Sequence, residues 1–159
     1  MAKIEYTHTD EQGLDSIAAL WQKLLEYHKS LSQHFSGRLG SMTFDLRKKG
    51  LLEKSREGVI RIDLARDVGR GGLVGYCVST ISRDRQGEIE SIYIEPDYRE
   101  SGIGDNLMKR ALHWMDEYPV TKKVLAVGTG NEEVFDFYSR YDFYPRTTIL
   151  EQIEAGEGE

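Results

Sequence analysis

Residues 92–108 read IYIEPDYRESGIGDNLM, and this stretch decides how the middle of the chain folds. A β-branched and aromatic run ends at Pro96, which favours a strand up to that point. Two glycines follow, and beyond them Ile103, Leu107 and Ala111 recur at the spacing of one helix face. The stretch therefore predicts a strand, a turn and an amphipathic helix in succession.

The turn from Arg99 to Gly104 is a candidate anion site. Amide groups at a helix N-terminus lack intrahelical partners and carry the positive end of the helix dipole. Gly102 and Gly104 have no Cβ, so a phosphate could approach the backbone, and Arg99 could add a charge-assisted contact. Arg-x-x-Gly-x-Gly alone also occurs in ordinary turns, and its spacing matches neither the P-loop nor the dinucleotide fingerprint.

The following part of the chain repeats the order of strand, turn and helix. Residues 122–127 form a strand-like run, residues 128–130 read Gly-Thr-Gly, and a helix is predicted from Asn131 to Arg140. Asn131 is then a natural N-cap. Three- and four-residue spacing places Val134, Phe137 and Tyr138 on one face of this helix.

Together the two halves resemble the GNAT superfamily of N-acetyltransferases, with motif support over about residues 88–146. The matching positions are Pro96, Arg99, Gly102, Gly104, Asn131, Tyr138 and Phe143. The chain departs from the family pattern at Asp142, where glycine is usual. Asp is among the few other residues that tolerate a positive φ, so this departure is a local cost only.

The resemblance implies an acetyl-CoA site where two neighbouring strands, one ending near Glu95 and the other near Gly128, separate from each other. The pantetheine arm would take strand-like hydrogen bonds from the backbone, and the pyrophosphate would meet the turn. The implied coenzyme-binding residues are Ile92, Tyr93, Ile94, Arg99, Glu100, Ser101, Gly102, Ile103, Gly104, Asn131 and Tyr138. Glu100 must point to solvent there, because a carboxylate would repel the pyrophosphate.

Amide formation from a thioester needs an amine without its extra proton, a donor for the carbonyl oxygen and a proton for the leaving sulfur. The resemblance places the general acid at Tyr138, and a backbone N–H near Tyr93 or Ile94 would serve the carbonyl oxygen. Glu90 is the candidate base, ahead of Glu88, with which it shares one pleat side. Without the resemblance, the aromatic side chains are packing residues and the two glutamates are solvated charges.

The histidines do not have the spacing of a metal site, and no metal is expected. His28 and His34 lie at the end of the first predicted helix, a region that covers the acceptor pocket in the resembling family. They could contact the acceptor, but a surface or capping role is the favoured interpretation.

The whole chain predicts an α+β fold in the order β-α-α-β-β-β-α-β-α-β, a GNAT-like, mostly antiparallel sheet flanked by helices. The first two helices are expected over residues 10–31 and 42–54, and a three-stranded meander over residues 59–95. The last strand is expected within residues 143–153. One domain would cover residues 1–153, followed by a disordered tail over residues 154–159.

Composition narrows the function classes. The 159 residues suffice for one core, and a formal charge of −6 argues against non-specific nucleic-acid binding. Cys77, the single cysteine, sits in an apolar strand and is expected to be a buried hydrophobe. Neither a membrane span nor a secretory signal is evident, so a cytoplasmic protein is expected.

The function implied is therefore an acetyl-CoA-dependent N-acetyltransferase that uses direct attack in a ternary complex. The expected acceptor is a small primary amine or an amino-acid or amino-sugar derivative. The alternatives are a protein lysine or N-terminal acetyltransferase, a non-catalytic acyl-CoA sensor, and a structural module with an empty groove. An exposed edge at the final strand would also allow a homodimer.

Overall fold

A computed structural model describes residues 2–154 and contains one five-stranded sheet in the order β1-β2-β3-β4-β5. The strands are β1 (Ile4–Thr9), β2 (Val59–Asp67), β3 (Gly72–Ile81), β4 (Gln86–Ile94) and β5 (Lys122–Leu125). Neighbouring strands from β1 to β4 are antiparallel, whereas β4 and β5 are parallel. The predicted α+β fold with a meander and a mostly antiparallel sheet is confirmed.

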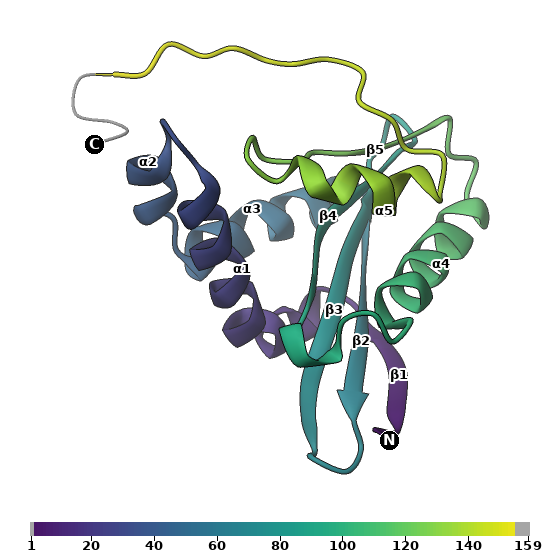
Figure 1. The fold of residues 1–159 in the computed structure, drawn as a ribbon. Helices are drawn as coiled ribbons and strands as arrows, with labels where there is room; N and C mark the ends of the chain where they lie inside the picture. The colour runs from purple at the N-terminus through teal and green to yellow at the C-terminus, as the bar shows by residue number, and fades with distance from the viewer. Residues whose placement is uncertain (1, 155–159) are drawn as a thin grey trace.

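Helices cover both faces of this sheet (Figure 1). One face packs against the 3₁₀ segment η1 (Glu11–Ile17) and the helices α1 (Ala18–Leu31) and α3 (Phe44–Glu57). The short helix α2 (Ser36–Gly40) follows α1 in the sequence and contacts it. The other face packs against α4 (Ile103–Asp116), whose buried side chains include Ile103, Leu107 and Ala111. These apolar positions confirm the helix predicted after the two glycines.

The start of the chain differs from the predicted continuous helix over residues 10–31. Asp10 caps the 3₁₀ segment η1 by accepting a hydrogen bond from the amide of Gln12 at 3.0 Å, and regular α-helix begins only at Ala18. The second helix starts at Phe44, because the Thr43 hydroxyl accepts from the amide of Leu46. Cys77 is fully buried between β2 and β4, as expected for a small hydrophobe.

The strand predicted within residues 143–153 is absent from the described part of the chain, so this prediction was wrong. After the 3₁₀ segment η3 (Glu132–Val134) and α5 (Phe135–Ser139), residues 143–154 run without regular structure toward α2 (Figure 1). A strand requires a hydrogen-bonded partner, and this segment leaves the sheet instead. Ile149 and Leu150 are consequently 87% and 91% exposed. Of the predicted tail, residues 155–159 lie outside the described residues.

A β-bulge in β4 at Glu90 positions the site. Val78 of β3 pairs with Ser91, but the next residue, Ser79, pairs with Ile89, so Glu90 is the extra residue on β4. The parallel pairing of β4 with β5 ends at the same place, at Ile89 and Leu125. A bulge bends its strand and locally ends pairing, which lets the two strands separate beyond this point.

Candidate functional site

A cavity of about 580 Å³ opens where β4 and β5 separate. Residues 89–94 line one side of it and residues 125–128 line the other. One end lies at the turn before α4, and the opposite end lies between α1, α2 and the start of α3. The cavity lies between β4 and β5, the pair of strands that the resemblance implied, and its lining reaches from the turn before α4 to the helices α1, α2 and α3.

The turn before α4 has the geometry expected of an anion site. Glu100 and Gly102 adopt left-handed backbone conformations with φ of 63° and 88°, and α4 begins at Ile103 without a side-chain cap. The first amides of α4 therefore have no side-chain acceptor. Glu100 is exposed and also contributes to the cavity lining. Gly104 has a packing role as well, because a Cβ there would lie 3.3 Å from the ring of Phe137.

Arg99 is held at this end of the cavity by two contacts. Its Nε donates to the carbonyl oxygen of Ile94 at 2.9 Å, and its guanidinium lies over the ring of Tyr93 at 5.5 Å from the centroid. These contacts leave its two Nη groups without a hydrogen-bond partner among residues 2–154. The positive charge is thereby fixed beside the turn.

Asn131 is not the helix cap that the sequence predicts. Its side chain makes no capping hydrogen bond, and its Oδ1 is buried without any partner in the described chain. The preceding Gly130 has φ of 98°, and a Cβ there would lie 2.4 Å from the carbonyl oxygen of Leu31 in α1. A buried acceptor without a donor costs free energy unless a ligand supplies one, so Asn131 is suited to a ligand N–H.

Tyr138 lies in the cavity wall with its hydroxyl unpaired within residues 2–154. Burial raises the pKa of its phenol to about 12, so the hydroxyl keeps its proton near neutral pH.

The positive φ of 64° at Asp142 meets the condition under which Asp can replace glycine in the family pattern. The short turn that follows returns Phe143 to Tyr138, whose carbonyl accepts from the Phe143 amide.

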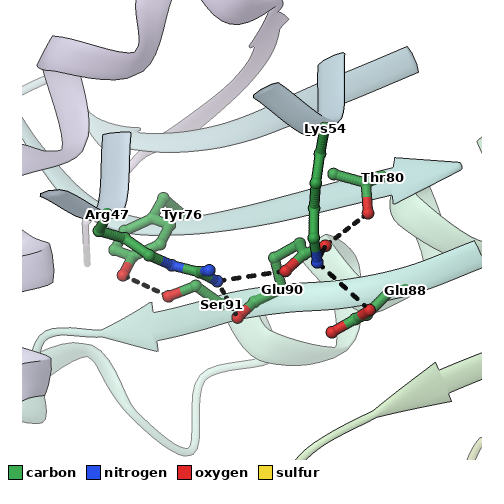
Figure 2. Close-up of polar contacts among 7 residues, drawn as sticks. All are labelled: Arg47, Lys54, Tyr76, Thr80, Glu88, Glu90 and Ser91. Carbon is green, nitrogen blue, oxygen red and sulfur yellow. Dashed lines mark hydrogen bonds and ion pairs between the residues drawn. The ribbon is translucent and has the colours of Figure 1, made fainter. Parts of the chain in front are cut away.

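Glu90 is held in a network of three donors (Figure 2). Its Oε1 accepts from Nη2 of Arg47 at 3.2 Å, and its Oε2 accepts from Nζ of Lys54 at 2.7 Å and from the Thr80 hydroxyl at 2.6 Å. Its side chain is only 1% exposed. Lys54 also lies 3.6 Å from Glu88, which confirms that the two glutamates share one face. Both oxygens of this buried carboxylate are therefore already engaged by two cations and a hydroxyl.

The α1–α3 end of the cavity is mostly apolar. Its lining comprises Trp21, Leu24, Leu25, Tyr27, His28, Leu39, Met42 and Arg47. The Tyr27 hydroxyl donates to the Glu133 carboxylate at 2.8 Å. Burial lowers the pKa of the His28 imidazole, so this ring is neutral near neutral pH. Sequence analysis missed Arg47, since nothing near residue 47 marks it as different from the other basic residues of its helix.

Most of the predicted coenzyme-binding residues line one cavity. They are Ile92, Tyr93, Ile94, Arg99, Glu100, Gly102, Gly104, Asn131 and Tyr138. Two others do not line it: Ile103 is buried in the core under α4, and the Ser101 hydroxyl donates back to the carbonyl of Tyr98 at 2.5 Å.

No group of three His, Cys, Asp or Glu residues within 2–154 has the arrangement of a metal site. No helix of that range is long and apolar enough to cross a bilayer.

The sequence has known relatives. The sequence model of the Acetyltransferase (GNAT) family matches residues 21–143. An uncharacterized N-acetyltransferase of Archaeoglobus fulgidus is 30% identical over 100 residues, which are 59% of this chain and 65% of that protein. Another from Methanocaldococcus jannaschii is 29% identical over 102 residues, which are 64% of this chain and 45% of that protein. The matches thus span about half to two thirds of these relatives' lengths.

Solved structures share the fold at low sequence identity. A GCN5-related N-acetyltransferase from Ralstonia eutropha superposes with a TM-score of 0.74 and 20% identity, covering 95% of this chain and 99% of that one. An aminoglycoside N-acetyltransferase in complex with CoA has a TM-score of 0.68 and 12% identity, covering 98% and 97%. A ribosomal-protein-alanine N-acetyltransferase from Brucella melitensis has a TM-score of 0.65 and 17% identity, covering 96% and 100%.

Proposed function

The chain belongs to the Acetyltransferase (GNAT) family, and we propose that it transfers an acetyl group from acetyl-CoA to a primary amine. The observation that carries this proposal is the continuous cavity from the turn before α4 to the pocket under α1. A coenzyme entering at the turn can reach Tyr138 within that cavity and meet an acceptor from the opposite end.

The residues at the turn suit acetyl-CoA. Arg99 and the uncapped amides of α4 offer positive charge to a diphosphate. The separated edge of β4 offers backbone groups to the amides of a pantetheine arm, and the buried Oδ1 of Asn131 offers an acceptor. When bound, acetyl-CoA would supply the acetyl thioester that an amine attacks.

Tyr138 would assist the departure of the sulfur. A phenol with a pKa of about 12 is a weaker acid than an alkyl thiol with a pKa of about 8.5, so full proton transfer to a free thiolate is uphill by about 5 kcal/mol. The hydroxyl therefore acts first as a hydrogen-bond donor while negative charge builds on the sulfur. A backbone N–H near Tyr93 or Ile94 would donate to the thioester carbonyl oxygen.

We infer that the His28 imidazole, in preference to the Glu90 carboxylate, accepts the proton of the amine. An alkylamine of pKa about 10.4 is almost wholly protonated near neutral pH, so it must lose a proton before it attacks. The Glu90 carboxylate is already shared among Arg47, Lys54 and Thr80. The His28 imidazole is neutral and lines the acceptor end, and it makes no hydrogen bond within the described residues. The sequence-based proposal for Glu90 is retained as the alternative.

A small-molecule acceptor is the favoured class, since the acceptor end is a pocket lined by residues of α1, α2 and α3. Proteins of this fold include enzymes named for aminoglycosides and for a ribosomal protein, so a protein lysine or N-terminus is the second class. A non-catalytic acyl-CoA sensor would use the same turn but would not need Tyr138.

Two measurements test the proposal. Saturating acetyl-CoA should raise the melting temperature, because a ligand that binds only the folded state stabilises it. Release of free CoA thiol should then depend on adding an amine from a panel of amino acids, amino sugars, diamines and peptides. A thermal shift without thiol release on any amine would favour the sensor, and no thermal shift at all would favour a structural module.

A further inference from the structure

Arg47 is anchored at the acceptor end of the cavity with part of its guanidinium still available. Its Nη2 donates to the backbone carbonyl of Glu90 at 3.1 Å and to the Glu90 carboxylate at 3.2 Å (Figure 2). A guanidinium has five N–H donors in a fixed plane. The hydrogens on Nε and Nη1 have no acceptor within residues 2–154, and the side chain is 26% exposed.

The anchor does not neutralise the charge of Arg47. Glu90 is shared with Lys54, which approaches the same carboxylate at 2.7 Å. Two cations therefore face one buried carboxylate, and the second carboxylate near them, Glu88, lies beside Lys54 and outside the cavity lining. An additional anion beside Arg47 would be favoured electrostatically.

Arg47 is the one charged residue that α1, α2 and α3 contribute to the described lining. Their other lining side chains are apolar, among them Trp21, Leu25 and Leu39, except for the neutral imidazole of His28 and for Tyr27, whose hydroxyl donates to Glu133. Apart from Glu90 of β4, the other charged groups of the lining come from the turn, α4, η3 and the end of α5: Arg99, Glu100, Asp105, Glu133 and Arg140. A cationic group would find no available carboxylate beside Arg47, because the Glu90 oxygens are already engaged.

We propose that the acceptor is an amine that carries a carboxylate, and that Arg47 binds this carboxylate through its Nε and Nη1 hydrogens. This inference rests on the proposed acetyl transfer and narrows its substrate class to amino acids and related amino-carboxylates. It disfavours polycationic acceptors. Arg47 is thus a specificity-determining residue that α3 supplies and the bulge at Glu90 orients.

The test compares matched pairs of amines in the thiol-release assay. Each pair is an amino acid and its carboxamide, for α-amino and ω-amino series. We expect the ratio of kcat/KM for acid over amide to fall about 10- to 100-fold in Arg47→Gln, the effect of losing a charge-assisted hydrogen bond. Arg47→Lys should keep part of the ratio. Arg56→Gln, at an exposed position of the same helix outside the cavity lining, should leave it unchanged.

Comparing each pair between variants cancels the difference in amine pKa between acid and amide. If amines release thiol but the ratio is the same in wild type and Arg47→Gln, the carboxylate proposal is overturned while acetyl transfer stands. If no amine releases thiol, the proposed acetyl transfer is wrong. Calorimetry on the CoA-loaded protein then tests the carboxylate site independently of activity. A carboxylate site is supported if the CoA-loaded wild type binds an N-acetylamino acid but not its carboxamide, and if Arg47→Gln no longer binds the acid. Equal binding of the acid and the carboxamide, or binding of neither, overturns the carboxylate proposal.

Discussion

Arg47 donates from one guanidinium nitrogen to both the backbone carbonyl and the carboxylate of Glu90. Both acceptors are available because Glu90 is the bulged residue of β4, outside regular pairing with β3. This bulge directly follows the last residue of β4 that pairs with β5, Ile89, so it lies where the two strands separate. One extra residue in a strand therefore opens the cavity and fixes a cation from α3 at its acceptor end.

Replacing Glu90 with alanine should destabilise the protein. Arg47 and Lys54 would lose the carboxylate that they share, and their charges would be left beside the buried Thr80 hydroxyl. We expect the free energy of unfolding to fall by about 2–4 kcal/mol, measured by urea denaturation. Glu53→Ala, at an exposed position of α3, should change it by about 0.5 kcal/mol or less. Equal effects of both substitutions would show that the network contributes nothing.

Tyr138→Phe should lower kcat about 100-fold or more with little change in the KM for acetyl-CoA. The substitution removes one hydroxyl from the cavity wall and leaves the ring packing in place. Because the pKa of Tyr138 is about 12, ionisation of the phenol should cause no loss of wild-type activity up to about pH 10. Tyr144→Phe is the control, since Tyr144 is 68% exposed and outside the cavity lining. Unchanged kcat in Tyr138→Phe would exclude its role at the sulfur.

The central stretch was predictable because its signals are local. The proline after the strand and the positive φ that suits Gly102 are properties of consecutive residues, and the structure places strand, turn and helix at nearly the predicted positions. The spacing of Asn131 and Tyr138 likewise placed both residues at one cavity, although the capping role expected of Asn131 was wrong.

The remaining features depend on contacts between distant segments. The bulge at Glu90 is an extra residue in one of two paired strands, and no residue type in β4 predicts it. Arg47 reaches Glu90 across 43 positions of sequence. The run ending at Ile153 has strand-like residues but no strand partner within residues 2–154, so its β propensity is overridden.

Protonation of His28 should couple to stability and to activity. Burial lowers the pKa of the folded-state imidazole below its ordinary value of 6.5, so the unfolded chain binds this proton more readily. The free energy of unfolding should therefore increase as the pH rises toward about 6.5. This contribution of His28 should be lost as the pH falls below that value. Activity should fall in the same direction if the neutral imidazole accepts the amine proton.

His28→Gln should reduce the slope of stability against pH, measured by urea denaturation between about pH 5 and pH 7. His113→Gln serves as the control, because its side chain is 81% exposed. A stability slope that is the same in His28→Gln and wild type would remove His28 as its source. An acid limb of kcat that persists in His28→Gln would assign the base to another group, with Glu90→Gln as the next variant.

The segment after α5 should pair with a second copy of the chain. Ile149 and Leu150 are almost fully exposed on an extended run, and no strand in the described residues pairs with it. Exposed apolar side chains beside unpaired backbone favour association. Light scattering should therefore report a dimer at micromolar concentration, and the double substitution Ile149→Asp with Leu150→Asp should shift it to monomer. A monomeric wild type would contradict this expectation.

Asn131→Ala should separate ligand binding from folding. The buried Oδ1 has no donor in the described protein, so removing it should change the free energy of unfolding without acetyl-CoA by about 1 kcal/mol or less. The rise in melting temperature on adding acetyl-CoA should shrink, because the variant has lost an acceptor for a ligand N–H. Asn106→Ala is the matched control: its Oδ1 accepts from Nε of Arg110 at 2.6 Å, outside the cavity lining, so it should lose stability and keep the full thermal shift. A full shift in Asn131→Ala would mean that this amide contacts no coenzyme.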